Sequence, residues 1–304
     1  MHARFQKVAV LFGGLSAERE IALRSGRTVI NALLAAGYQV VELDLVERSL
    51  LLPWLAEHKP DVVFPVLHGR MGEDGVLQGL LEWLGIPFVG SRVMGSAIAM
   101  DKLRSKMIFK TSGVPTPDFV VVRSLADAMV HQSQLCYPVF VKPVREGSSI
   151  GIGRADDQGE LMAAVSQALA FDSEVLVEQF VDGPEYTVGI IGTEVLPVIG
   201  LKPHARFYDY EAKYVSNETE YLLPSGLSAD QEAAVQAMSL LAFNVLGCSG
   251  WGRVDLMLDA QGALQVLEVN TIPGMTDHSL VPKAARAYGW ELPELMHRLL
   301  ATVK

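Results

Sequence analysis

The sequence predicts an α/β and α+β protein of several lobes that opens with a doubly wound parallel-sheet domain. At 304 residues the chain exceeds a usual single domain. Its first third alternates strand-like and helix-like segments, which is typical of right-handed crossovers in a parallel sheet. Near Ser91 the rhythm changes to an α+β order. We therefore expect three lobes, at residues 1–91, 92–180 and 181–304.

The first lobe begins with a β-prone run at residues 7–13, which ends in a Gly13-Gly14 turn. Helical spacing follows over residues 18–34, and further strands are predicted at 39–44 and 61–66. Ligands bind beyond the carboxyl ends of strands in sheets of this kind. The glycine-rich loop 68–75 occupies such an end and is available for a ligand.

The middle lobe is predicted to begin with a helical stretch that carries Lys102, followed by a strand at 137–142 that ends in Lys142. Strands at 150–154 and 174–179 follow. In the last lobe we expect two more strands, a polar stretch at 204–220, a long helix at 229–246 and a hairpin that ends at Asn270.

Composition excludes several classes of protein. A formal charge of −10 would repel a nucleic-acid backbone. No apolar run approaches the ~20 residues of a membrane helix, and no secretory leader precedes the first strand. Cys136 and Cys248 are too few for a disulfide framework and lack zinc-type spacing. We expect buried thiols in a cytoplasmic protein with no nucleic-acid or membrane partner.

A hairpin is predicted from two β-prone runs, 251–258 and 263–270, that flank the turn formers Asp259 to Gly262. With Asp259 opposite Gly262, Arg253 would oppose Glu268 and Asp255 would oppose Val266. Period-two alternation then places four polar residues on one face, namely Arg253, Asp255, Glu268 and Asn270. Two carboxylates and an amide oxygen are hard ligands suited to Mg²⁺ and to substrate phosphates. The alternative is an ordinary wet sheet face.

Two lysines at the ends of a predicted helix and a predicted strand indicate a nucleotide site. Lys102 and Lys142 could clamp phosphate oxygens, and the loop 146–151 could fold over them, because glycine permits close backbone approach. Glu178 and Glu185 flank the junction of the last two lobes, where a carboxylate could bind a ribose. Neither GxxxxGK[ST] nor GxGxxG is present, which removes the best support for a dehydrogenase.

Seven segments in order resemble those of the D-alanine:D-alanine ligase family of the ATP-grasp superfamily, and they span essentially the whole chain. They read LFGGLSAERE, LHGRMGEDGVLQGLLE, MDKLRSK, VKPVREGSSIGI, YDYEAKY, GWGRVDLML and LEVNTIPGMTDHSLVP. The resemblance implies a three-lobed ATP-grasp fold. It also implies ligation of two D-alanine molecules for peptidoglycan precursors, and a homodimer.

The resemblance carries nucleotide and metal roles onto particular residues. It implies ATP contacts from six of them: Lys102, Lys142, Glu178, Gln179, Val181 and Glu185. Two Mg²⁺ ions, with Mn²⁺ as a substitute, would be held by Asp255, Glu268 and Asn270. Gln179 stands where the family often has Lys, and Leu15 stands where a polar residue is common, so pocket details differ here.

Substrate and catalytic roles also follow from the resemblance. Glu18 would pair with the first D-alanine's ammonium and connect through Ser148 to Tyr214, with His68 near the same substrate. The second D-alanine's carboxylate would be bound by three residues, Lys213, Ser279 and Leu280. Oxyanion donors would be Arg253 and the Gly274 N–H. A closing loop over residues 210–220 would keep water from the acyl phosphate.

Three other functions stay open on the sequence. A ligase of the same fold could make D-alanyl-D-lactate or D-alanyl-D-serine, although Tyr214 favours the dipeptide because the depsipeptide makers resemble this pattern with Phe there. A nucleotide-binding regulator would be expected to lose part of the polar hairpin face, which is complete here. A nicotinamide-dependent oxidoreductase is the least favoured, because its fingerprint is missing.

Overall fold

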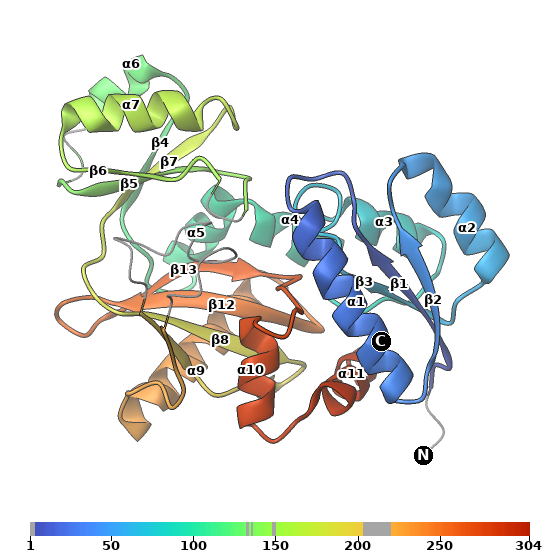
Figure 1. Cartoon of the computed structure of the whole chain (residues 1–304). Coiled ribbons are helices and arrows are strands. Elements are labelled where there is room, and N and C mark those ends of the chain that lie inside the picture. Colours follow the sequence, from blue (N-terminus) through green and yellow to red (C-terminus); the bar gives the residue numbers. More distant parts are fainter. Residues whose placement is uncertain (1–3, 132–133, 135, 148–149, 203–219) are drawn as a thin grey trace.

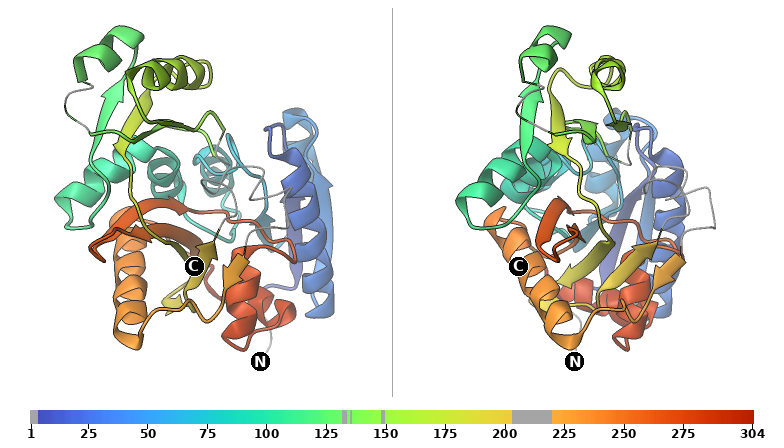
Figure 2. Two further views of the ribbon diagram at one scale, coloured as in Figure 1. Left: turned by 60° about the vertical axis from the view of Figure 1, so that its left-hand side comes forward. Right: turned by 90° about the vertical axis from the view of Figure 1, so that its left-hand side faces the viewer.

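The computed structural model describes residues 4–131, 134, 136–147, 150–202 and 220–304. Within these ranges the chain forms three sheets, one after another along the sequence, with helices packed against each (Figure 1). The central sheet stands apart from the other two, which lie closer together (Figure 2).

The N-terminal sheet is parallel, in the order β2-β1-β3, as the alternating sequence predicted. Its strands and helices are β1 (Lys7–Phe12), β2 (Gln39–Asp44), β3 (Val62–Pro65), α1 (Arg19–Ala35), η1 (Arg48–Leu50), α2 (Leu51–His58) and α3 (Val76–Trp83). Val8 and Val10 of β1 pack in one core with α1, whereas Ala9 and Leu11 pack in another with α2 and α3. Burial on both faces explains the continuous apolar run of β1.

The central sheet is antiparallel, in the order β4-β7-β5-β6. Its elements are β4 (Phe119–Val122), α6 (Leu125–His131), β5 (Val139–Pro143), β6 (Gly153–Ala155), α7 (Gln158–Ala168) and β7 (Val175–Gln179). Val139, Val141 and Val177 pack with α6 and α7 in one core. Strand alternation therefore turns Lys142 and Glu178 to the other face, away from these helices.

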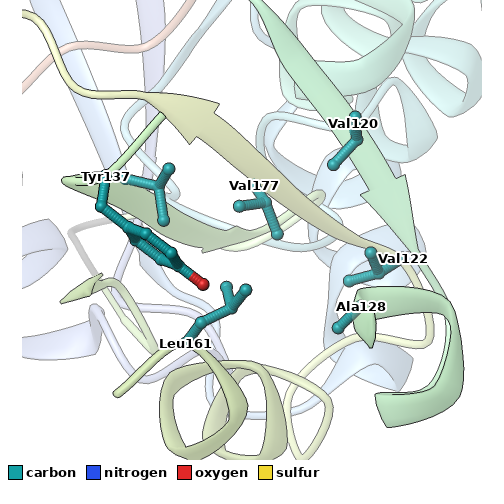
Figure 3. Close-up of a pocket in the computed structure, with 7 residues that line it drawn as sticks. Val120, Val122, Ala128, Tyr137, Leu161 and Val177 are labelled. Carbon is teal, nitrogen blue, oxygen red and sulfur yellow. The ribbon is translucent and has the colours of Figure 1, made fainter. Parts of the chain in front are cut away.

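A small apolar cavity lies between this sheet and its helices (Figure 3). It is lined by Val120, Val122, Ala128, Tyr137, Val139, Leu161 and Val177. Because these residues belong to the helix-facing side, the cavity is separated by the sheet from the side that carries Lys142. It is a packing gap of the core and contributes nothing to the candidate site.

The C-terminal sheet has the order β11-β10-β8-β12-β13, with β9 paired to β8. Its elements are α4 (Val93–Met100), α5 (Lys102–Thr111), β8 (Glu185–Ile191), β9 (Glu194–Val195), β10 (Ile199–Lys202), β11 (Glu220–Leu222), α9 (Ala229–Val245), β12 (Trp251–Leu258) and β13 (Leu264–Asn270). Ala99 of α4 and Phe109 of α5 pack in one core with α9 and β12. Although the sequence placed α4 and α5 in the middle lobe, they cover the C-terminal sheet; the boundaries at 91 and 180 stay predictions.

The last two helices, α10 (Leu280–Ala287) and α11 (Leu292–Ala301), return to the N-terminal lobe. Leu295 and Leu299 of α11 pack in the same buried cluster as Val29 and Leu33 of α1. Arg4 Nη1 donates to the Val303 carbonyl at 2.7 Å. Figure 1 shows α11 beside α1.

Burial corrects one sequence expectation. Cys248 is buried, as predicted, and burial raises the pKa of its thiol to about 12. Cys136 is exposed, because it lies in the connection before β5 and outside any core cluster, so the expectation of two buried thiols is wrong for this residue. Among the described residues, no helix has the length and apolar character needed to cross a membrane.

Candidate active site

The β12–β13 hairpin places the four predicted polar residues on one face, but not in the predicted register. Asp255 opposes Glu268 and Arg253 opposes Asn270, because an irregularity next to Asp255 shifts the pairing. The turn also differs, since the Asp259 N–H donates to the Ala263 carbonyl at 2.9 Å and Gly262 adopts a φ of 78°. The predicted pairs Arg253 with Glu268 and Asp255 with Val266 are therefore wrong.

The register shift has a packing cause. Val266 and Val269 are three residues apart and both are buried in the core under the sheet, where Leu256 and Val254 oppose them. Strict alternation would turn one of them to the polar face. A bulge inserts one residue on β13 and keeps both valines in the core. It also sets Glu268 directly across from Asp255.

Asp255 is held in place by two neighbours. Arg253 forms a bidentate pair with it, with Nε to Oδ1 at 2.8 Å and Nη2 to Oδ2 at 2.6 Å. Thr187 of β8 donates its hydroxyl to Oδ1 at 2.7 Å. Charge-assisted pairs of this fork geometry fix both orientation and distance. The carboxylate is thus preorganised in a buried position.

Glu268 faces a cation from another element. Its Oε2 atom lies 3.4 Å from Lys102 Nζ, which also donates to the Glu146 carbonyl at 2.7 Å. Lys102 is the first residue of α5, and Asp101 caps that helix by accepting from the Arg104 N–H. The contact brings the predicted phosphate lysine to the predicted metal face.

The donor set fits Mg²⁺. Asp255 and Glu268 supply carboxylate oxygens, and Asn270 supplies an amide oxygen that also accepts from the Ile272 N–H at 3.0 Å. Within the described ranges, His, Cys, Asp and Glu form no cluster of three that could bind a metal by itself. Mg²⁺ demands six ligands and readily takes the remainder from water and substrate phosphates. The set suits a metal that arrives with a nucleotide.

A second charged group lies on the face of the central sheet that is turned away from α6 and α7. Lys142 Nζ donates to Glu178 Oε2 at 2.6 Å, and Lys106 Nζ lies 3.1 Å from Glu178 Oε1. Burial favours a raised pKa for Glu178, but attraction to the two lysines holds it below its ordinary value. Burial favours a lowered pKa for Lys142, but Glu178 keeps it raised. All three groups therefore stay ionised near neutral pH.

The other nucleotide candidates lie near this group. Val181 is buried after β7, and Glu185 begins β8, where its charge helps to raise the pKa of Lys142. The side chain of Gln179 is hydrogen-bonded to the neighbouring loop. Its Nε2 donates to the Cys136 carbonyl at 2.8 Å, and its Oε1 accepts from the Cys136 N–H at 3.1 Å. A lysine at this position would lack the acceptor for this pairing.

Glu18 and His68 meet at the N-terminal lobe. Both side chains are buried, and Ser16 connects their backbones by donating to the His68 carbonyl at 2.8 Å and accepting from the Glu18 N–H at 3.2 Å. Glu18 makes no side-chain cap to α1, which argues against a mere capping role. Burial would lower the pKa of His68, but the negative charges of Glu73 and Glu18 raise it. His68 Nδ1 lies 3.8 Å from Glu73 Oε1.

Gly147 lies in the described part of the loop that was predicted to fold over phosphates, and it approaches this group. A Cβ on Gly147 would lie 3.3 Å from Glu18 Oε2, and a Cβ on Gly69 would lie 3.1 Å from the same atom. Loops from two lobes therefore approach one carboxylate, and glycine permits the close approach. Leu15, the other departure from the family pattern, is 56% exposed in the connection between β1 and α1.

Gly274, Ser279 and Leu280 lie in the loop and helix start after β13. Ser279 is the N-cap residue of α10, and its hydroxyl accepts from the Thr276 N–H at 3.0 Å. A Cβ on Gly274 would lie 2.9 Å from Ser279 Oγ. The Met275 N–H donates to Ser25 Oγ of α1 at 3.1 Å, so this loop is anchored to the N-terminal lobe. Ser148, Lys213 and Tyr214 lie outside the described residues.

The loop before Gly147 is anchored by charge. Arg145 contacts three carboxylates: Nη1 donates to Asp172 Oδ1 at 2.7 Å, Nε donates to Asp101 Oδ2 at 3.2 Å, and Nη2 pairs with Glu174. The Lys102 N–H donates to the Val144 carbonyl at 3.1 Å. These contacts connect the start of α5, the end of β5 and the start of β7 at one point.

Comparison with known proteins decides the family. Residues 108–301 match the model described as D-ala D-ala ligase C-terminus, and residues 50–91 match D-ala D-ala ligase N-terminus. A D-alanine–D-alanine ligase of Ectopseudomonas mendocina is 50% identical over 297 residues, which cover 98% of this chain and 94% of that protein. The chain belongs to the D-alanine–D-alanine ligase family. A second D-alanine–D-alanine ligase, from Marinomonas sp., is 48% identical. The match covers 96% of this chain and 94% of the Marinomonas protein.

Solved structures agree with the family assignment. A Bacillus anthracis D-alanine–D-alanine ligase complexed with ATP superposes with a TM-score of 0.87 at 33% identity, covering 98% of this chain and 97% of its own. The VanG D-Ala:D-Ser ligase of Enterococcus faecalis superposes with a TM-score of 0.85 at 31% identity. The match covers 98% of this chain and 99% of the VanG chain. The three-lobed ATP-grasp fold expected for this ligase family is thereby confirmed.

Sequence reasoning missed several supporting residues of this family member. Ser16, Glu73, Thr187 and Lys106 all contact predicted site residues, yet none was singled out. Only Lys106 left a signal, because it is one helical turn after Lys102 on a helix with Lys at every fourth position. The others depend on contacts across elements far apart in the sequence.

Proposed function

We propose that the protein joins two D-alanine molecules into D-alanyl-D-alanine, using ATP to activate the first carboxylate as an acyl phosphate. The observation that carries this proposal is the approach of Lys102 to Glu268 at 3.4 Å. It sets a phosphate lysine against a polar face that carries metal-type ligands. Membership in the ligase family, at 50% identity over 98% of the chain, supports the same reaction.

The charge balance of the site favours a nucleotide that arrives with metal. Lys102 and Arg253 are each balanced by a carboxylate, Glu268 and Asp255 respectively. A triphosphate therefore finds little surplus positive charge on this face. Mg²⁺ supplies it, and Asp255, Glu268 and Asn270 would hold the ion. When bound, the ion would neutralise the phosphate oxygens and lower the barrier to transfer.

The phosphate grip would come from Lys102, Lys142 and the backbone of the loop after Arg145. Lys142 brings a positive charge on the face of the central sheet turned away from α6 and α7, and Glu178, Val181 and Glu185 would border the same region for the base and the sugar. Since Gln179 is engaged with Cys136, its contribution would come from its backbone. Because a backbone contact does not depend on the side chain, glutamine could replace the lysine that the family often has at this position.

The first D-alanine would lie between Glu18, His68 and the phosphate loop. Glu18 would pair with its ammonium, and the raised pKa of His68 favours a protonated imidazole beside the carboxylate of the substrate. Ser148 and Tyr214 would complete this contact. The carboxylate of the first D-alanine would attack the terminal phosphoryl group of ATP in line, and ADP leaves.

The second D-alanine would attack the acyl phosphate as a free amine, after its ammonium has lost a proton. Charge develops on the carbonyl oxygen, where Arg253 and the Gly274 N–H would donate hydrogen bonds. Arg253 is fixed by its bidentate pair with Asp255, so it needs no reorganisation at that moment. Lys213, Ser279 and Leu280 would bind the second carboxylate, and phosphate then leaves.

The test measures ADP release and product mass with ATP and Mg²⁺ in four mixtures: D-alanine alone, L-alanine alone, D-alanine with D-serine, and D-alanine with D-lactate. We expect ADP release coupled to D-alanyl-D-alanine and none with L-alanine alone. A preference for D-serine or D-lactate as second substrate would replace the dipeptide with another product class. ATP binding without ADP release under any of these conditions would indicate a regulator. Use of Mn²⁺, a homodimer and a cytoplasmic location stay predictions.

A further inference from the structure

Lys106 is a fully buried lysine that none of the steps above uses. It lies on α5, one turn after Lys102, and its exposed fraction is 0%. A lysine is almost never buried to this degree unless its charge is paired, because removing an ammonium from water costs several kcal/mol. Its partners should therefore show why the fold keeps it.

The first partner is Glu178, which Lys106 shares with Lys142. Glu178 is 2% exposed, and its two oxygens are divided between the lysines, with Oε1 at 3.1 Å from Lys106 Nζ and Oε2 at 2.6 Å from Lys142 Nζ. Two cations around one carboxylate leave a net positive charge. Because Lys106 neutralises Glu178 from the buried side, Lys142 keeps charge and donors for an anion on the open side.

The second partner connects Lys106 to the metal-bearing strand. Lys106 Nζ donates to Thr116 Oγ1 at 2.6 Å, and the Thr116 hydroxyl donates to the Val266 carbonyl at 2.8 Å. Val266 lies on β13 immediately before the bulge, two residues ahead of Glu268. One ammonium thus joins β7 of the central sheet to β13 of the C-terminal sheet, on either side of the proposed nucleotide site.

We propose that Lys106 is a positioning residue of the nucleotide site, which fixes Glu178 and Lys142 on one wall and the β13 backbone on the other. This inference rests on the proposed function, since it assigns ATP to the space between these walls. Lys106 itself touches no substrate. Its loss should loosen the nucleotide and leave the amino-acid pockets, formed around Glu18 and Ser279, unchanged.

The charges around Lys106 give the proposal a pH signature. Burial lowers the pKa of Lys106 to about 8. The attraction of Glu178 on β7 and Glu268 on β13 opposes this lowering, whereas the repulsion of Lys142 on β5 adds to it. Lys106 is therefore charged below this pH and neutral above it. Nucleotide affinity should fall as the pH rises from 7 to 9, because neutral Lys106 no longer neutralises Glu178.

Lys106→Met tests the proposal, since methionine is unbranched like lysine, is shorter by one heavy atom and carries no charge. The matched control is Lys110→Met, one turn further on α5, where Lys110 is exposed and pairs with Asp118 at 2.9 Å. Isothermal titration calorimetry with Mg-ATP, without D-alanine, should show ~10- to 100-fold weaker binding for Lys106→Met, the range expected for losing hydrogen bonds to a charged group. Lys110→Met should bind as wild type.

The same variants are then assayed for ligation. We expect a raised KM for ATP with an unchanged KM for D-alanine, and loss of the wild-type fall in affinity above pH 8. A partly misfolded protein would instead lower kcat and binding stoichiometry and leave the Kd of the folded fraction intact. Wild-type ATP affinity in Lys106→Met overturns the proposal.

Should Lys106→Met not fold, Thr116→Val replaces it. Valine keeps the shape of threonine and breaks the connection to Val266, so a severalfold weaker ATP affinity is expected and wild-type affinity overturns the proposal. Failure of the proposed function looks different. In that case the wild type binds ATP but releases no ADP with D-alanine, and calorimetry still decides the role of Lys106, because binding requires no ligation.

Discussion

Asp255 lies directly opposite Glu268 across the β12–β13 ladder, and the two carboxylates have different cationic neighbours. Asp255 is paired with Arg253 of its own strand, whereas Glu268 faces Lys102 of α5. One carboxylate is thus fixed within the sheet and the other is shared with a neighbouring element. Their separate roles can be tested by changing each residue alone.

Asp255→Asn and Glu268→Gln should each lower turnover by at least ~100-fold, because a lost metal ligand removes several kcal/mol of charge stabilisation. The measurement is ADP release with D-alanine as a function of Mg²⁺ concentration. Asp230→Asn, an equivalent change at an exposed position of α9, should leave the Mg²⁺ dependence unchanged. Normal turnover in both site variants would remove the metal assignment.

Thr187→Val should raise the Mg²⁺ requirement severalfold and cost about 1–2 kcal/mol of unfolding free energy, because it removes a buried hydrogen bond to an ionised carboxylate. The hydroxyl in question donates to Asp255 at 2.7 Å. Ser239→Ala is the control, since within the described part of the chain its hydroxyl bonds only to the Val235 carbonyl of its own helix. An unchanged Mg²⁺ titration in Thr187→Val would show that Arg253 alone positions Asp255.

His68 should make stability depend on pH. Its folded pKa lies above 6.5 because Glu73 and Glu18 outweigh burial, so its contribution is complete below pH 6.5 and is lost as pH rises through the folded pKa. The difference in unfolding free energy between wild type and His68→Gln, measured by denaturant titration, should therefore be largest at low pH and shrink as the pH rises through the folded pKa. A difference that grows with pH would contradict this sign.

Arg145→Ala should cost about 1–3 kcal/mol of unfolding free energy, because it leaves three carboxylates without their shared guanidinium. The side chain is 39% exposed, which keeps the loss below that of a fully buried pair. Arg123→Ala is the matched control, since among the described residues the Arg123 guanidinium pairs with Glu174 alone, and its side chain is 61% exposed. Equal losses in the two variants would show that Arg145 has no special place in the network.

The parts that the sequence predicted well depend on local periodicity. The parallel sheet follows from apolar runs of β1 and β3, and the polar hairpin face follows from alternation within β12. The register failed because it depends on a core contact, and the spacing of Val266 and Val269 was the available signal. Lys106 was missed because its role arises from residues 106, 116, 178 and 266, which no local pattern connects.

The return of α11 to α1 has a consequence for biosynthesis. The N-terminal lobe buries Val29 and Leu33 against Leu295 and Leu299, so its core stays open until the far end of the chain has left the ribosome. During translation this lobe would expose apolar surface for most of the time that the other two sheets need to form. Nascent chains stalled before Leu292 should accordingly be degraded by protease at the first lobe, while the central sheet resists.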